Sequence, residues 1–440
     1  MPNEHHLNDA THCALRENKM TAKTNRPAIR FQGFKDEWEE KRLGDITYYL
    51  KGFAFKAMSY RSDGIPIIRV SDLSENSIKN NTEKVFISFN EAKDYEIWEI
   101  HKNDILVTTV GSKPQLVESA VGRAIFINEN NTGLLNQNLL ILRNSDKNFE
   151  NRFIYCQMKS KAYLNHIETI QRGNANQSNI TVTDLGDFQF CIPKIKEQTT
   201  IAAFFRHLDE LLARLQAQHS KTQQFKQAML GKMFPVSGSL QPEIRLQGFS
   251  GDWVERKLGE ICEKVIEKNQ NREFTETFTN SAEFGVISQR DFFDKDISNK
   301  ENIDGYYIVK SNDFIYNPRI SSFAPVGPVN RNKLNRTGIV SPLYFVFRTY
   351  GVDYQFLETF FQSRHWHDFM FLNGDTGARA DRLSIKDKIF LEMPILMPSE
   401  KEQTAIGNFF QKTDRLLALQ GEKIQKIQQL KTALLANMMV

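Results

Sequence analysis

The chain repeats itself, and this repetition constrains its fold more than any other feature. The segment "IRFQGFKDEWEEKRLGDI", from Ile29 to Ile46, returns as "IRLQGFSGDWVERKLGEI", from Ile244 to Ile261. A second segment, "KEQTTIAAFFRHLDELLARLQ" beginning at Lys196, returns as "KEQTAIGNFFQKTDRLLALQG" beginning at Lys401. Because the order is kept, one unit is duplicated: an opening segment, a variable middle and a long helix.

Each variable middle has the pattern of a mixed α+β domain of about 150 residues. In the first, the runs "GIPIIRV", "NDILVTTV", "RAIFIN" and "LNQNLLILR" predict strands, and "RFIYCQMKSKAYLNHIETI" predicts one helix. In the second, "FGVISQRD", "YYIVK", "DFIYNP" and "LYFVFR" predict strands, and "QFLETFFQSRHWHDFMF" predicts one helix. Weak echoes, such as "NDILV" and "NDFIY", indicate that the two middles share a scaffold.

The repeated segment after each middle predicts a long helix. In the second copy, Ser399 and Glu402 have the spacing of a capping box. Apolar residues in these helices follow the three-and-four spacing of coiled coils, although His219 and Thr222 weaken the stripe in the first copy. About 37 helical residues would span roughly 55 Å, enough for a spacer. The residues expected at helix pairing or partner docking are Leu211, Leu215, Phe225, Met229, Leu416, Ile424, Ile427 and Leu434.

These patterns divide the chain into five parts. We expect a disordered tail at 1–25, a first domain with its opening segment at 26–193, a spacer helix at 194–236, a second domain at 237–398 and a final spacer helix at 399–440. The chain has 40% hydrophobic and 25% charged residues and lacks a long apolar run, which predicts a soluble, cytoplasmic protein. Its four widely spaced cysteines fit free thiols.

Motifs that carry catalysis are scarce. No phosphate-binding loop or glycine-rich dinucleotide loop follows a predicted strand. The "HWH" run at His365 to His367 is a poor metal site, because residues two apart point away from each other on a helix. The sequence therefore predicts a non-catalytic chain that binds neither a metal nor a cofactor.

Polar side chains suited to reading DNA are more abundant. Arg, Lys, Asn and Gln contact base edges in the major groove, and hydroxyl groups contact phosphates. Four segments are dense in such groups: "TTVGSKPQ", "QRGNANQSN", "NPRISS" and "NGDTGARADR". The candidate DNA contacts are Lys113, Gln115, Arg172, Asn174, Asn176, Gln177, Asn317, Arg319, Ser321, Arg379 and Arg382.

The paired opening segments "RFQGF…W…RLGDI" and "RLQGF…W…KLGEI", with the paired "KEQ" helix starts, resemble the specificity subunit of type I restriction–modification enzymes. The resemblance extends from about Arg26 to Val440. It implies two target recognition domains, each reading half of a bipartite, asymmetric site in double-stranded DNA. It also implies that the two helices pair as an antiparallel coiled coil with pseudo-twofold symmetry and set the gap between the half-sites.

The same resemblance implies the partners. Two modification (methyltransferase) subunits would methylate adenine with S-adenosylmethionine, and two restriction (motor–nuclease) subunits would use ATP and Mg²⁺. Similar docking surfaces for identical partners would explain the duplicated opening segment. Two alternatives stay open from the residues alone: a coiled-coil scaffold that never touches DNA, and a stand-alone nuclease.

Overall fold

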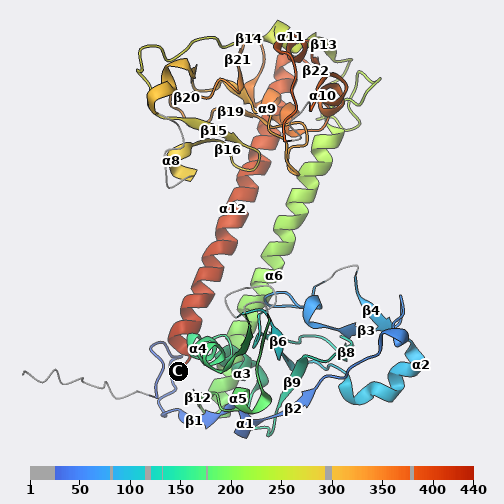
Figure 1. Cartoon of the computed structure of the whole chain (residues 1–440), viewed down its shortest axis with the longest axis vertical. Helices are drawn as coiled ribbons and strands as arrows, with labels where there is room; N and C mark the ends of the chain where they lie inside the picture. The colour runs from blue at the N-terminus through green and yellow to red at the C-terminus, as the bar shows by residue number, and fades with distance from the viewer. Residues whose placement is uncertain are drawn as a thin grey trace, which may run out of the picture. The chain divides into compact units, whose positions relative to one another are not determined.

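The computed structural model describes residues 25–79, 83–113, 120–130, 132–174, 177–292, 300–376 and 381–440. The chain forms two compact units, Met1–Ala213 with Gln425–Val440, and Arg214–Ile424. Two long helices, α6 (Ile195–Lys232) and α12 (Glu400–Met438), each contribute one part to each unit (Figure 1). The predicted pair of α+β domains, each followed by a long helix, is therefore confirmed.

The first unit is built on a four-stranded antiparallel sheet in the order β2-β9-β5-β7. Smaller sheets have the orders β4-β3-β8, β10-β11-β6 and β1-β12. The strands are β1 (Glu39–Arg42), β2 (Thr47–Lys51), β3 (Ile65–Ile68), β4 (Val85–Ile87), β5 (Ile105–Thr108), β6 (Val110–Gly111), β7 (Ala124–Phe126), β8 (Leu134–Leu135), β9 (Leu139–Asn144), β10 (Arg172–Asn174), β11 (Gln177–Asn179) and β12 (Gln189–Ile192). Short helices include α1 (Leu43–Ile46), α2 (Phe89–Ala92) and α5 (Val182–Gly186).

The second unit repeats the scaffold with a four-stranded sheet in the order β14-β21-β18-β19. Two-stranded sheets pair β13 with β22, β15 with β16 and β17 with β20. The strands are β13 (Val254–Lys257), β14 (Cys262–Lys264), β15 (Phe278–Ser281), β16 (Gly285–Ser288), β17 (Tyr307–Val309), β18 (Phe314–Tyr316), β19 (Val329–Arg331), β20 (Gly338–Val340), β21 (Phe345–Thr349) and β22 (Pro394–Met397). Short helices include α7 (Leu258–Ile261), α8 (Gln289–Phe292) and α11 (Asp387–Leu391). The predicted strands of both middles are confirmed.

The weak sequence echoes correspond to one repeated turn. Asn103 has a left-handed φ of 73°, and the next residue, Asp104, accepts a hydrogen bond from the His101 amide. Arg143 on β9 then binds Asp104 with Nε–Oδ1 and Nη2–Oδ2 distances of 2.6 and 2.8 Å. The second unit has the same turn with Asp313 and the arginine of β21, Arg348. This buried carboxylate fixes the start of a central strand against its neighbour in both units.

The single helix predicted in each middle is wrong, because two shorter helices stand in its place. In the first unit these are α3 (Asn151–Gln157) and α4 (Lys161–Ile170), and the Ser160 hydroxyl accepts from the Tyr163 amide to begin the second. In the second unit they are α9 (Tyr354–Gln362) and α10 (His367–Asn373). The Ser363 hydroxyl donates to the Phe360 carbonyl there, which ends α9. Serine side chains that bond nearby backbone groups compete with helix continuation.

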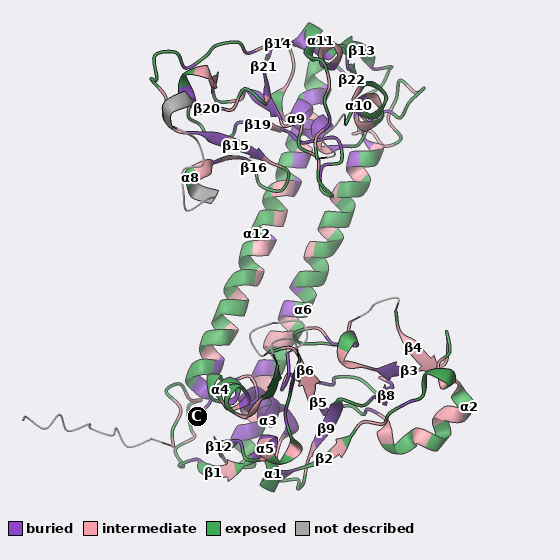
Figure 2. Cartoon of the chain, in the orientation of Figure 1, coloured by how far each residue is buried: buried purple, intermediate pink, exposed green. Residues whose placement is uncertain are grey.

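Each core is completed by the C-terminal end of a long helix. In the first unit Leu435 and Met438, at the end of α12, pack in one cluster with Phe205 near the start of α6. In the second unit Met233, past the end of α6, packs in one cluster with Phe410 near the start of α12. Figure 2 shows buried residues where these helix ends meet the sheets. The two helices thus run antiparallel where they meet within each unit.

Polar pairs join the two helices inside each unit. In the first, Asp209 of α6 binds Lys431 of α12 and Arg152 of α3, with Arg152 Nη2–Asp209 Oδ2 at 3.1 Å. In the second, Lys226 of α6 pairs with Asp414 of α12. Of the predicted seam residues, Leu215 is buried, Leu211, Met229, Ile424, Ile427 and Leu434 are half-buried, and Phe225 and Leu416 are 48% and 47% exposed. Two ion pairs, with a hydrogen bond from the Gln420 amide to the Thr222 hydroxyl at 3.4 Å, therefore join the helices in addition to the apolar clusters at their ends.

Three cysteines, Cys156, Cys191 and Cys262, are free and buried, while Cys13 lies outside the described residues. Burial raises the pKa of the Cys156 and Cys262 thiols to about 12, so they are poor nucleophiles. In the described ranges no helix combines the length and the apolar character that crossing a membrane requires.

Candidate nucleic-acid interface

The repeated segments meet in a buried ion pair that occurs once in each unit. Arg30 of the first opening segment binds Glu197 with Nε–Oε1 and Nη2–Oε2 distances of 2.6 and 2.7 Å. Arg245 binds Glu402 in the same bidentate way, at 2.8 and 2.7 Å. The hydrogen bond to Glu402 is the main cause that raises the pKa of Arg245 above its ordinary value. Each pair fastens an opening segment to the first turn of a long helix.

This pair modifies the predicted capping box of α12. The Glu402 amide donates to the Ser399 hydroxyl at 3.4 Å, as predicted, but the Glu402 carboxylate binds Arg245. The next residue of the "KEQ" motif is also occupied, since Gln403 donates to the Pro398 carbonyl and accepts from the Asp353 amide. Sequence reasoning missed these pairings, although identity between the repeats was their signal. Much of the repeated sequence therefore positions the domains on their helices.

In the first unit, the structure brings together two candidate segments that lie far apart in the sequence. Strand β11 pairs with β10 on one side and with β6 on the other, with Ser178 opposite Gly111. Arg172 and Gln177 lie on β10 and β11 with exposed side chains, and exposed Lys113 follows β6 closely. Arg172 Nη2 binds Asp184 Oδ2 at 2.8 Å, so this carboxylate orients the guanidinium. Asn174 lies in β10, whereas Gln115 and Asn176 lie outside the described residues.

The second unit also brings its two candidate segments together. Arg319 and Arg382 form a β-bridge, and the Ile320 amide donates to the Asp381 carbonyl at 3.0 Å. Both arginines line a cleft of about 360 Å³, and Asp381 lies 3.8 Å from Arg319. Arg379 lies outside the described residues. The other residues of the cleft are Thr279, Asn280, Ser281, Ala282, Asn317, Pro318, Ile320, Ser321, Pro328, Leu343 and Tyr344.

Two of the candidates in this cleft also hold the loop in shape. The side-chain amide of Asn317 donates to the Asn280 carbonyl at 2.9 Å, and its side-chain oxygen accepts from the Arg319 amide at 3.0 Å. The Ser321 hydroxyl accepts from the Ala324 amide at 3.2 Å. These internal bonds shape the loop that carries Arg319. The guanidinium groups of Arg319 and Arg382 are the part of the cleft suited to phosphate or guanine.

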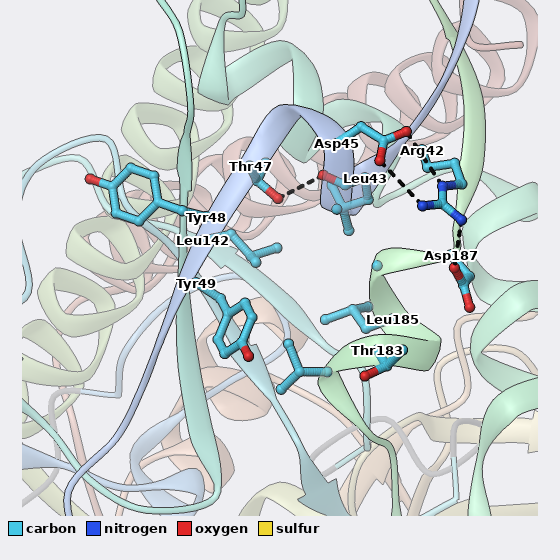
Figure 3. A pocket seen from close by; sticks show the side chains of 13 residues that line it. Arg42, Leu43, Asp45, Thr47, Tyr48, Tyr49, Leu142, Thr183, Leu185 and Asp187 are labelled. Carbon is cyan, nitrogen blue, oxygen red and sulfur yellow. Dashed lines mark hydrogen bonds and ion pairs between the residues drawn. The ribbon is translucent and has the colours of Figure 1, made fainter.

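A different groove lies beside the first opening segment (Figure 3). It has a volume of about 450 Å³ and lies between helix α1, strand β2 and helix α5. Arg42 stands between Asp45 and Asp187 at 3.3 Å from each, while Tyr48 and Tyr49 are 52% and 54% exposed. Sequence reasoning did not single out this groove. In the second unit Glu263 and Lys264 follow the first residue of the corresponding strand β14, so charged side chains stand there in place of the two tyrosines.

Among the residues that the structure describes, no three His, Cys, Asp or Glu side chains form a cluster that could hold a metal ion. His365 of the "HWH" run instead packs against Phe234, with ring centroids 5.8 Å apart, and burial lowers its pKa. The geometry therefore defines two related domains, whose scaffolds match and whose polar loops differ.

Comparison with known proteins shows which family the chain belongs to. The sequence profile of the type I restriction modification DNA specificity domain matches residues 35–222 and again 250–429, so the chain belongs to that family and carries two copies of its domain. Domains of this family confer DNA sequence specificity and are not themselves catalytic, so the chain is a DNA-specificity protein and not an enzyme.

Two characterised relatives are specificity subunits. The type I restriction enzyme MjaVIII specificity subunit of Methanocaldococcus jannaschii is 20% identical over 434 residues, which cover 90% of each chain. The type I restriction enzyme EcoAI specificity subunit of Escherichia coli is 26% identical over 131 residues, which cover 30% of this chain and 22% of the relative.

Two solved structures share the fold. The S subunit of the type I restriction–modification system of M. genitalium has a TM-score of 0.59 at 13% identity, covering 94% of this chain and 99% of the other. A chain from a type I R-M system, solved to explain complex assembly and conformational transition, has a TM-score of 0.50 at 15% identity, covering 90% and 96%.

Proposed function

We propose that this chain is the specificity subunit of a type I restriction–modification complex and reads a bipartite, asymmetric site in double-stranded DNA. Residues 26–193 and 237–398 form the two target recognition domains, and each reads one half-site. The observation that carries this proposal is the meeting of two distant polar segments in each unit: Lys113 and Arg172 in one, Arg319 and Arg382 in the other. Because the two domains share a scaffold and differ in these polar loops, they are proposed to read two different half-site sequences.

The long helices, at 194–236 and 399–440, are proposed to set the gap between the half-sites. The antiparallel contacts within each unit, such as Asp209 with Lys431 and Lys226 with Asp414, support this role because ion pairs at defined positions fix a helix register. The partners proposed are two modification subunits and two restriction subunits. S-adenosylmethionine, ATP and Mg²⁺ would belong to those subunits. The repeated opening segments are the proposed docking surfaces for the modification subunits.

A domain exchange tests the proposal that each domain reads one half-site. The chain is expressed with its cognate modification subunit, and residues 43–193 are replaced by the matching domain of another specificity subunit. We expect one half of the recognised sequence to change while the other half and the gap stay the same. A change in both halves would contradict the proposed domain boundaries.

Salt dependence separates DNA reading from a scaffold role. If arginine and lysine side chains such as Arg319 and Lys113 contact phosphates, the logarithm of the binding constant falls linearly with the logarithm of salt concentration, by about 0.9 per phosphate neutralised. We expect a steep fall for the complex with modification subunits, measured by fluorescence anisotropy on a labelled duplex. An affinity for DNA too weak to measure at low salt would favour the scaffold.

Replacing Arg382 with alanine tests an individual contact. If Arg382 reads guanine, the Arg382→Ala complex should lose about 1–3 kcal/mol on its own site and relax specificity at one base position. Binding is measured on duplexes in which each base pair of the half-site is changed in turn. Arg272→Ala is the matched control, because it removes an exposed guanidinium of the same unit that is paired with Asp304 and lies outside both the cleft and the opening segment. An equal loss on every duplex would make Arg382 a phosphate contact instead.

A further inference from the structure

An aromatic side chain is presented at the tip of a tight turn next to the cleft of the second unit. The Ser321 amide donates to the Ala324 carbonyl at 3.0 Å, and the Ala324 amide donates back to the Ser321 carbonyl at 3.1 Å. Ser322 and Phe323 are therefore the two tip residues of a hairpin-like turn, which the Ser321 hydroxyl closes further. The Phe323 side chain is 77% exposed. The hydrogen bonds hold the backbone of the turn, and the exposed Phe323 side chain is carried at its tip.

The surroundings of the turn combine positive charge with apolar surface. Ile320 and Ser321, which lead into the turn, line the cleft together with Arg319 and Arg382. On the same cleft lies Leu343, which is 59% exposed. The Leu383 amide donates to the Pro318 carbonyl at 2.8 Å, which ties the segment before the turn to the segment that carries Arg382. The turn that carries the exposed ring therefore leads out of a cleft lined by two arginines. The guanidinium groups suit the phosphate of a nucleotide, and the ring suits its flat base.

We propose that Phe323 is a wedge that enters a base step of the DNA half-site read by the second domain and unstacks it. Apolar side chains used in this way open a base step while basic side chains hold the adjacent backbone. Arg319 and Arg382 supply that basic support here, and the hydrogen-bonded turn fixes the backbone that carries the ring. The inference rests on the proposed DNA-reading function, and it adds a distortion that polar base readout does not require.

The test uses the full chain assembled with its cognate modification subunit, on duplexes that carry 2-aminopurine at successive positions of the recognised site. This base analogue brightens when it is unstacked. Brightening at an adenine that a modification subunit flips out for methylation is expected with every variant. Beyond those positions, we expect brightening at one step of one half-site with the unchanged chain. Phe323→Ala should abolish the brightening at that step and weaken binding by about 5- to 150-fold, the range found when an aromatic that stacks on a base is replaced by alanine. Phe323→Trp should retain both.

The matched control is Ile266→Ala, since Ile266 is 76% exposed on the same unit and does not line the cleft. It should bind and brighten as the unchanged chain does. If the unchanged complex binds its site and no position beyond the flipped adenines brightens, or if Phe323→Ala brightens normally at that step, the wedge is refuted while DNA reading stands. If the unchanged complex has no measurable affinity for DNA, the proposed function fails and the wedge fails with it. Thermal unfolding of each variant checks that the second unit is folded.

Discussion

Removal of residues 435–440 is expected to unfold the first unit and leave the second unit folded. The deletion takes Leu435, Met438 and Met439 out of the first core, where they are 9%, 3% and 8% exposed. Truncating a single buried Leu or Met costs about 2–5 kcal/mol, and a whole domain is stable by only about 5–15 kcal/mol. The deletion also removes the Val440 carbonyl that accepts from the Cys191 amide at 3.0 Å.

Hydrogen–deuterium exchange followed by mass spectrometry measures this effect segment by segment. We expect strands β5 and β9 to lose protection, while β18 and β21 of the second unit keep theirs. Asn437→Ala is the control within the deleted segment, because its side chain is exposed and bonds only the Ala433 carbonyl. Unchanged protection of β5 and β9 in the truncated chain would show that the end of α12 is not part of the first core.

Arg245→Ala is expected to lower the free energy of unfolding of the second unit by about 3–5 kcal/mol, because it leaves a buried carboxylate unpaired. The side chain of Glu402 is 2% exposed, and Arg245 supplies both of its guanidinium contacts. Chemical denaturation followed by tryptophan fluorescence is a suitable measurement, since Trp253 belongs to the same core. The corresponding change in the first unit is Arg30→Ala.

Two further variants serve as comparisons for Arg245→Ala. Arg256→Ala removes an exposed arginine, 57% exposed and paired with Glu260, and should cost about 0–1 kcal/mol. The double variant Arg245→Met with Glu402→Leu removes both charges and should recover most of the stability, because no unpaired charge stays buried. An Arg245→Ala chain as stable as the Arg256→Ala chain would mean that the repeated ion pair does not hold the opening segment in place.

Features with local causes were predictable from the sequence, and features that depend on long-range pairing were not. The strand around Ile105 was predicted because a short apolar run follows an Asn-Asp turn. The helix breaks at Ser160 and Ser363 were missed, because apolar spacing continues across them and only the side-chain bonds reveal the interruption. The bond of Arg245 to Glu402 joins residues 157 positions apart, and only identity between the repeats pointed to it.

In the candidate interface, too, the residue types could be predicted from the sequence, whereas the long-range pairing of the segments could not. Residue type and position in the repeats drew attention to Arg172, Arg319 and Arg382. No pattern in the sequence indicated that β6 would pair with β11 or that Arg319 would bridge to Arg382. Phe323 was passed over, because its exposure depends on a two-residue turn tip. Which bases such loops read depends on side-chain placement against DNA, and for this reason the individual contacts stay predictions.

Sequencing of methylated DNA tests the central claim most directly. The chain is co-expressed with its cognate modification subunit in a host without adenine methylation, and N6-methyladenine is mapped across the genome. Two unlike domains on paired helices predict one asymmetric motif made of two short specific parts, separated by a gap of fixed length in which any base occurs. A continuous motif, or an unmethylated genome with both subunits present and folded, would contradict it.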